Sequence, residues 1–156
     1  MAEHAEGSTE VYATPAEVLA VVADFEAYPD WVAGLEEVEI LARDRRGRGT
    51  RVAFRLRTPL GEQAYTLAYR YLPKDAGVSW TYVEGTLEDL SGAYTLEPAG
   101  DGATRVTYRL EVALGMPLPG LVKRQAAKQI VRSALSDLKR RVPTRGSPRR
   151  RSTSRT

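Results

Sequence analysis

Residues 64–82 read AYTLAYRYLPKDAGVSWTY and contain the clearest strand pattern of the chain. Large apolar side chains alternate with small or polar ones on both sides of the central Pro-Lys-Asp-Ala-Gly. A period of two is typical of a strand with one buried face, and a proline and a glycine between two such runs are typical of a turn. The stretch therefore predicts two neighbouring antiparallel strands.

The same alternation extends in both directions from this pair. Between residues 35 and 112, six segments place large apolar residues on one face and polar residues on the other. Charged or Gly-containing turns, such as residues 43–49 and 100–102, separate them. Together with a short strand near Ser8–Tyr12, they predict a curved antiparallel sheet of about seven strands, with its outer face in water.

Helical signals flank the strands. Thr14-Pro15, followed by Glu17, forms a capping box and predicts a helix from Pro15 to about Phe25. Pro29 interrupts this helix, and residues 30–32 are predicted to form a second, very short helical piece. Residues 120–141 form a long amphipathic pattern, and only this helix is long enough to cover the apolar face of the sheet. The predicted fold class is α+β.

Composition excludes several kinds of site. The 156 residues include no Cys and a single His, His4. Disulfides, thiol nucleophiles, a Ser-His-Asp triad and a multi-histidine metal site are therefore not expected, and we predict neither a metal nor a cofactor. The chain contains no apolar run of the roughly 20 residues that cross a bilayer, and its acidic opening does not resemble a signal peptide. We therefore expect a cytoplasmic location.

Charge and composition divide the chain into three parts. We predict a flexible N-terminus at residues 1–7, one domain at residues 8–142 and a disordered Arg-rich tail at residues 143–156. The tail contains five arginines and no acid, whereas the remainder of the chain has a slight excess of acidic residues. The tail is therefore a candidate for weak contact with polyanions such as nucleic acid or anionic membrane, or simply a solubilising extension.

Three motifs, in order, resemble the START-like superfamily, which has the helix-grip fold and includes polyketide cyclase/dehydrase proteins. They are DFEAYPDW at residues 24–31, the late hairpin of residues 90–108 and GMPLPG at residues 115–120. The resemblance covers about residues 8–142. It implies an elongated apolar cavity between the sheet and the last helix, in which members bind lipids, sterols, quinones, hormones or polyketide intermediates. A minority of members catalyse cyclisation or dehydration.

Aromatic residues dominate the predicted inner face. Buried phenols need hydrogen-bond partners, so several tyrosines on one concave face favour a ligand pocket with apolar walls and polar hydroxyls. The alternative is that the rings only fill the core. Trp31 is either a packing anchor or the end of the pocket. The candidate ligand-binding residues are Trp31, Phe54, Tyr65, Tyr69, Trp80, Tyr82, Tyr94, Tyr108, Ile130 and Ala134.

Glu84 is the best candidate for a catalytic residue. Alternation from Trp80 and Tyr82 points its side chain inward, where burial favours the protonated form and suits a general acid/base. Alternatively, Glu84 reaches solvent at the end of its strand, just before Gly85.

Three functions remain open at this point. The first is a carrier or binding protein for an apolar, partly oxygenated small molecule such as a lipid, quinone or polyketide. The second is a polyketide aromatase/cyclase. The third is a ribosome- or partner-binding regulatory protein, for which the basic tail would be suited. The high ratio of Arg to Lys is typical of a GC-rich, bacterial genome. Nothing in the sequence indicates the oligomeric state.

Overall fold

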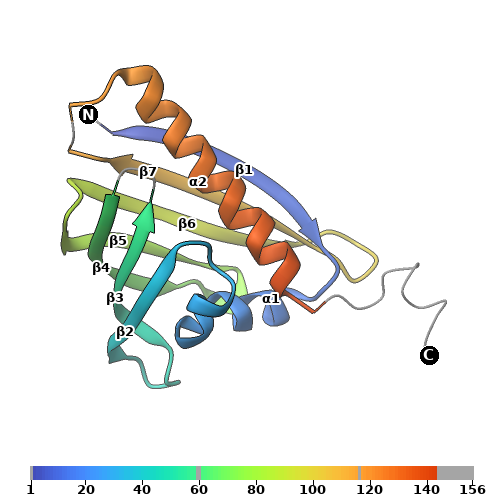
Figure 1. Cartoon of the computed structure of the whole chain (residues 1–156). Coiled ribbons are helices and arrows are strands. Elements are labelled where there is room, and N and C mark those ends of the chain that lie inside the picture. The colour runs from blue at the N-terminus through green and yellow to red at the C-terminus, as the bar shows by residue number, and fades with distance from the viewer. Residues whose placement is uncertain (1, 59–60, 116, 144–156) are drawn as a thin grey trace.

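All strands join one antiparallel sheet in the computed structural model, which describes residues 2–58, 61–115 and 117–143 (Figure 1). The strand order is β1-β7-β6-β5-β4-β3-β2, so consecutive strands pair as a meander and β1 pairs with β7. The predicted seven-stranded α+β architecture is confirmed. The strands are β1 (Glu3–Val11), β2 (Leu35–Arg43), β3 (Gly49–Thr58), β4 (Gly61–Tyr71), β5 (Gly77–Gly85), β6 (Asp89–Pro98) and β7 (Thr104–Ala113).

The helices are α1 (Pro15–Val22), the 3₁₀ helices η1 (Phe25–Asp30) and η2 (Pro73–Asp75), and the long helix α2 (Gly120–Arg141). The capping box forms as predicted: the Glu17 N–H donates to Thr14 Oγ1 at 3.2 Å, and the Thr14 N–H donates to Glu17 Oε1 at 2.8 Å. None of the described helices is long and apolar enough to cross a membrane.

The segment after α1 differs from the prediction. The first helix ends at Val22 rather than near Phe25, and the short helical piece expected at residues 30–32 lies at residues 25–30 instead. Pro29 has no N–H and so cannot continue an α-helical ladder. The chain takes the tighter 3₁₀ conformation, which includes Pro29 and ends before Trp31.

Strand β1 begins at Glu3, so the prediction of a flexible segment at residues 1–7 is wrong for residues 3–7. Its inward positions include Ala5 and Gly7, which carry no hydrophobic signal for a strand. Small residues are needed here because α2 lies directly on the strand. A Cβ atom at Gly7 would be 3.0 Å from Val131 Cγ1 and 3.1 Å from Leu135 Cδ1.

Helix α2 covers only one side of the concave face. It packs mainly against β1 and to a lesser extent against β7, as Figure 1 shows, while η1 packs against β2 and α1 contacts β5 and β6. The concave face between these contacts is covered by its own aromatic side chains. This leaves a region bounded by α2, η1 and the middle strands of the sheet, which is the candidate site.

The close contact at Gly7 gives a test of the helix position. We expect Gly7→Val to lower the free energy of unfolding by about 1–3 kcal/mol, because the added methyl groups overlap Val131 and Leu135. Ser8 is exposed on the opposite face, so Ser8→Val should leave stability nearly unchanged. Urea unfolding of both variants measures the difference. Equal stability of the two would contradict the close helix–strand contact.

Candidate functional site

A continuous layer of aromatic rings covers the inner face of the sheet. The Tyr69 ring centroid lies 5.9 Å from that of Trp80, which lies 5.7 Å from Tyr94 and 5.5 Å from Tyr108. On the other side, Phe54 lies 5.7 Å from Tyr65. These separations are typical of packed aromatic pairs. The alternating positions of five successive strands thus meet in one layer.

Helix η1 extends this layer beyond the sheet. The Phe25 ring lies 4.6 Å from Tyr69 and 5.2 Å from Tyr28, and the Tyr28 ring lies 5.1 Å from Trp31. The Tyr28 hydroxyl donates to the carbonyl of Val22, which ties η1 to the end of α1. The sequence-predicted residues Trp31, Phe54, Tyr65, Tyr69, Trp80, Tyr94 and Tyr108 are therefore brought together by direct or shared ring contacts.

Several polar atoms of this layer have no protein partner. Trp31 Nε1 is buried and unpaired, and it is the sole such side-chain atom among the described residues. Four phenol oxygens also lack a hydrogen bond to any described residue, but they are not fully buried, so each borders space that water can reach. These belong to Tyr65, Tyr69, Tyr94 and Tyr108. A layer that only filled the core would leave fewer such groups.

The phenols of this layer affect one another's pKa. Burial raises the pKa of Tyr65 to about 12 and raises that of Tyr69 well above its usual value. The phenols of Tyr28, Tyr65, Tyr108 and Tyr94 raise the pKa of Tyr69 further. Burial also raises the pKa of Tyr94, with smaller contributions from Tyr28 and from Asp137 on α2. Tyr69 therefore interacts electrostatically with four other phenols, and Tyr94 interacts with Tyr28 and with Asp137 on α2.

Two other tyrosines behave differently. Tyr82 lies on the predicted inner face, but its hydroxyl donates to the Leu87 carbonyl at 2.7 Å and accepts from the Leu87 N–H at 3.2 Å. The Tyr71 hydroxyl donates to the Gly49 carbonyl at 2.7 Å. Both hydroxyls bond to the backbone of another segment. Tyr82 therefore differs from the other candidate tyrosines, whose hydroxyls have no such partner among the described residues.

One face of α2 is turned toward η1. Ala126, Ile130 and Ala134 are four residues apart and share a side of the helix, with Asp137 one turn further on. Ile130 is 38% exposed, and the two alanines are partly buried. Because Asp137 reaches the η1–β2 connection, this side faces η1 rather than β1. The predicted positions Ile130 and Ala134 thus lie on the helix face that borders the site.

Asp137 is a residue that the sequence analysis missed. Its side chain is only 7% exposed, accepts a hydrogen bond from the Ala33 N–H at 3.2 Å and pairs with Arg140. It therefore links α2 to the segment that follows Trp31. A signal was present in the sequence, because Asp137 is the only acidic residue between Gly120 and Arg141 and lies on the apolar side.

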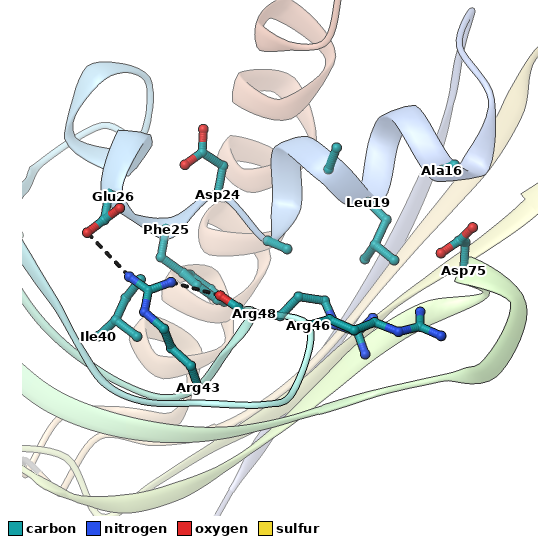
Figure 2. Close-up of a pocket in the computed structure, with 13 residues that line it drawn as sticks. Ala16, Leu19, Asp24, Phe25, Glu26, Ile40, Arg43, Arg46, Arg48 and Asp75 are labelled. Carbon is teal, nitrogen blue, oxygen red and sulfur yellow. Dashed lines mark hydrogen bonds and ion pairs between the residues drawn. The ribbon is translucent and has the colours of Figure 1, made fainter.

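The elongated cavity expected from the sequence does not coincide with either of two hollows lined by described residues. One, of about 440 Å³, lies on β2 and β3 beside Pro29, with Glu36, Glu39 and Arg55 in its lining. The other, of about 430 Å³, lies between α1, η1 and the β2–β3 hairpin (Figure 2). None of the candidate tyrosines or tryptophans lines either one.

The second of these hollows ends at the aromatic layer. Arg43 pairs with Glu26 at 3.5 Å and donates to the Gly47 carbonyl at 2.8 Å. Phe25 forms part of the wall (Figure 2). Phe25 is 1% exposed, and its ring is the one that contacts Tyr28 and Tyr69. A single ring therefore separates this groove from the phenols.

The prediction that Glu84 points inward is wrong. In the pairing of β4 with β5, Leu67 lies opposite Tyr82 and Thr66 lies opposite Glu84, so Val83 is an extra residue. This β-bulge shifts the alternation by one position and places Glu84 on the outer face, where it is exposed. The side chain does not face the aromatic layer.

Among the described residues, no three His, Asp or Glu side chains gather as a metal site would require.

The link between α2 and the η1–β2 connection can be tested by mutation. We expect Asp137→Ala to lower the free energy of unfolding by about 1–3 kcal/mol, since the Ala33 N–H loses its acceptor. Arg140 is mostly exposed, so Arg140→Ala should cost less than about 1 kcal/mol. Thermal and urea unfolding compare the two. A larger loss for Arg140→Ala would contradict this assignment.

The raised tyrosine pKa values predict a loss of stability at alkaline pH. The unfolded chain deprotonates near the ordinary pKa of 10, whereas folded Tyr65 holds its proton until about pH 12. Above about pH 10 the unfolded state therefore binds fewer protons, and the free energy of unfolding falls as pH rises. Tyr65→Phe should flatten this slope, which unfolding from pH 9 to 12 with phenolate absorbance would measure. An unchanged slope would contradict burial of this phenol.

Comparisons with known proteins agree with this architecture. The sequence profile of the family described as polyketide cyclase / dehydrase and lipid transport matches residues 11–139. No curated protein sequence is significantly similar to the chain. A START superfamily protein from Mycobacterium smegmatis superimposes with a TM-score of 0.82 at 23% identity, covering 89% of this chain and 96% of that one.

Two further structures share the fold. The Zhui aromatase/cyclase from a Streptomyces species has a TM-score of 0.68 at 17% identity, covering 92% of this chain and 97% of that chain. A STAR-related lipid transfer protein from Xanthomonas axonopodis has a TM-score of 0.70 at 18% identity, covering 89% and 85%. At these identities the likeness concerns the fold alone.

Proposed function

We propose that this chain, which belongs to the polyketide cyclase/dehydrase and lipid transport family, binds an apolar, partly oxygenated small molecule against the aromatic layer. The observation that carries the proposal is the set of unpartnered donors: Trp31 Nε1 and the hydroxyls of Tyr65, Tyr69, Tyr94 and Tyr108. Ligands of matching chemistry have fused rings or chains with ketone or hydroxyl oxygens, as in quinones and polyketides.

The physical basis is the pairing of apolar burial with oriented donors. Rings supply contact area, worth about 25 cal/mol per Å² of apolar surface removed from water before the costs of association. Trp31 Nε1, which is buried without a partner, costs free energy in the empty protein, and a ligand oxygen that accepts from it recovers that cost. The four hydroxyls can donate to ligand oxygens in place of water. Ala126, Ile130 and Ala134 supply an apolar wall on the helix side.

Binding is favoured over catalysis by the position of Glu84. A cyclase needs a group that moves protons at the bound chain. Glu84 is on the outer face, and the phenols near the space have pKa values raised by burial, which makes them donors of hydrogen bonds rather than bases at neutral pH. The proposal is therefore a carrier or binding protein.

Two ligands of the same ring skeleton test the role of the hydroxyls. Anthraquinone carries ketone oxygens and anthracene carries none, and binding of either is followed by quenching of Trp31 and Trp80 fluorescence. We expect Tyr94→Phe combined with Tyr108→Phe to weaken anthraquinone binding about thirtyfold, which corresponds to two ordinary hydrogen bonds, and to leave anthracene binding nearly unchanged. Stability should not fall, because neither hydroxyl has a described protein partner.

Tyr82→Phe is the matched control. Its hydroxyl bonds to Leu87, so the variant should lose about 1 kcal/mol of stability and keep its preference for anthraquinone. Equal weakening of both ligands by the double variant would contradict a role for the hydroxyls. Absence of saturable quenching by either ligand, or by fatty acids, would contradict the proposed function itself.

A further inference from the structure

The first turn of α2 presents two adjacent apolar side chains to solvent. Leu121 is 61% exposed and Val122 is 40% exposed, and Leu118 just before them is only partly buried. Ile130, which is also exposed, lies on the helix face that borders the site and does not belong to this surface. Single exposed apolar residues are ordinary, but an adjacent pair at the start of a helix is a potential contact surface.

A row of basic residues continues from Leu121 along the flank of α2 that lies beside β1. Arg124, Lys128 and Arg132 follow Leu121 at spacings of three or four residues, so they share its face, and all three are exposed. No acidic residue occurs between Gly120 and Ser136. We call this surface the basic helix face; it consists of Leu121, Val122, Arg124, Lys128 and Arg132.

The cations of the basic helix face form no ion pair with any described residue, whereas several arginines of the sheet do. No described carboxylate forms an ion pair with Arg124, Lys128 or Arg132, and Glu88, at the same end of the molecule beside Gly115, pairs with none of them. Several arginines of the sheet, by contrast, form ion pairs: Arg55 with Glu36, Glu37 and Glu62, Arg57 with Glu36, Arg105 with Glu10 and Arg109 with Glu6. The face therefore has positive charge available for an external anion.

We propose that the basic helix face docks on the surface of an anionic lipid bilayer, with α2 lying along the interface and Leu121 and Val122 inserted. Exposed apolar residues beside a row of unpaired cations are the combination that such surfaces bind. Nucleic acid would be attracted by the same cations but would gain little from Leu121 and Val122. The proposal does not depend on which ligand the aromatic layer binds.

Vesicle sedimentation with the full chain tests the proposal. We expect binding to phosphatidylcholine vesicles that contain about 30% phosphatidylglycerol, little binding to pure phosphatidylcholine, and weakening by added salt. Leu121→Ser combined with Val122→Ser should reduce the affinity by about tenfold or more. The triple variant Arg124→Gln, Lys128→Gln and Arg132→Gln should do the same. All five positions are exposed, so melting temperatures should stay close to that of the unaltered chain.

Two controls separate this face from charge elsewhere. Arg45→Gln, Arg51→Gln and Arg70→Gln remove the same charge from exposed, unpaired arginines outside α2 and should change the affinity much less than the α2 triple. A second control replaces the arginines that follow Pro143 with glutamine, namely Arg145, Arg149, Arg150, Arg151 and Arg155.

Several outcomes would overturn the proposal. Equal losses in the two triple variants would show a general effect of net charge. If vesicle binding were lost only when the arginines after Pro143 are replaced, the binding would belong to that segment. Unchanged affinity of the Leu121 and Val122 variant, or salt-dependent binding to nucleic acid with none to anionic vesicles, would exclude insertion of this face into a bilayer.

Discussion

The contact between α2 and β1 at Gly7 determines how the rest of the inner face is covered. Because Val131 and Leu135 lie against the backbone of this strand, the helix is held at one edge of the sheet. The middle strands must then bury their apolar face in another way, since an antiparallel sheet can leave only one face in water. Rings from the sheet and from η1 provide that cover, and the phenol hydroxyls enter the same space.

Stability alone does not explain the choice of tyrosine in this layer. Phenylalanine has nearly the same shape and needs no hydrogen-bond partner, so it is the better residue for a core. Tyr71 and Tyr82 satisfy their hydroxyls with backbone carbonyls, which accounts for them structurally. Tyr65, Tyr69, Tyr94 and Tyr108 have no such explanation among the described residues, and this contrast is the physical reason to assign them a role in binding.

The parts predicted from sequence are those specified by local signals. Alternation identified the six strands from Leu35 onward, and the cap at Thr14 and the apolar pattern of α2 identified helix positions. The errors arose where a single residue, or a contact between residues far apart in the sequence, determines the local structure. The bulge at Val83 reverses the direction of Glu84, and Gly7 is small because a helix about 120 residues later packs on it. Asp137 acquires its partner, Ala33, only in the folded chain.

The pairing of β1 with β7 also has a consequence for how the chain is made. Glu3 lies opposite Val112 and Val11 opposite Thr104, so the first strand to be synthesised finds its partner only after roughly a hundred further residues. Contacts of such long sequence separation form slowly and cost loop-closure entropy. On the ribosome, β1 remains an unpaired strand until β7 emerges, and α2 follows later still. A chain that ends before β7 would lack both the partner of β1 and helix α2, so the inner face can be completed only after these elements have been made.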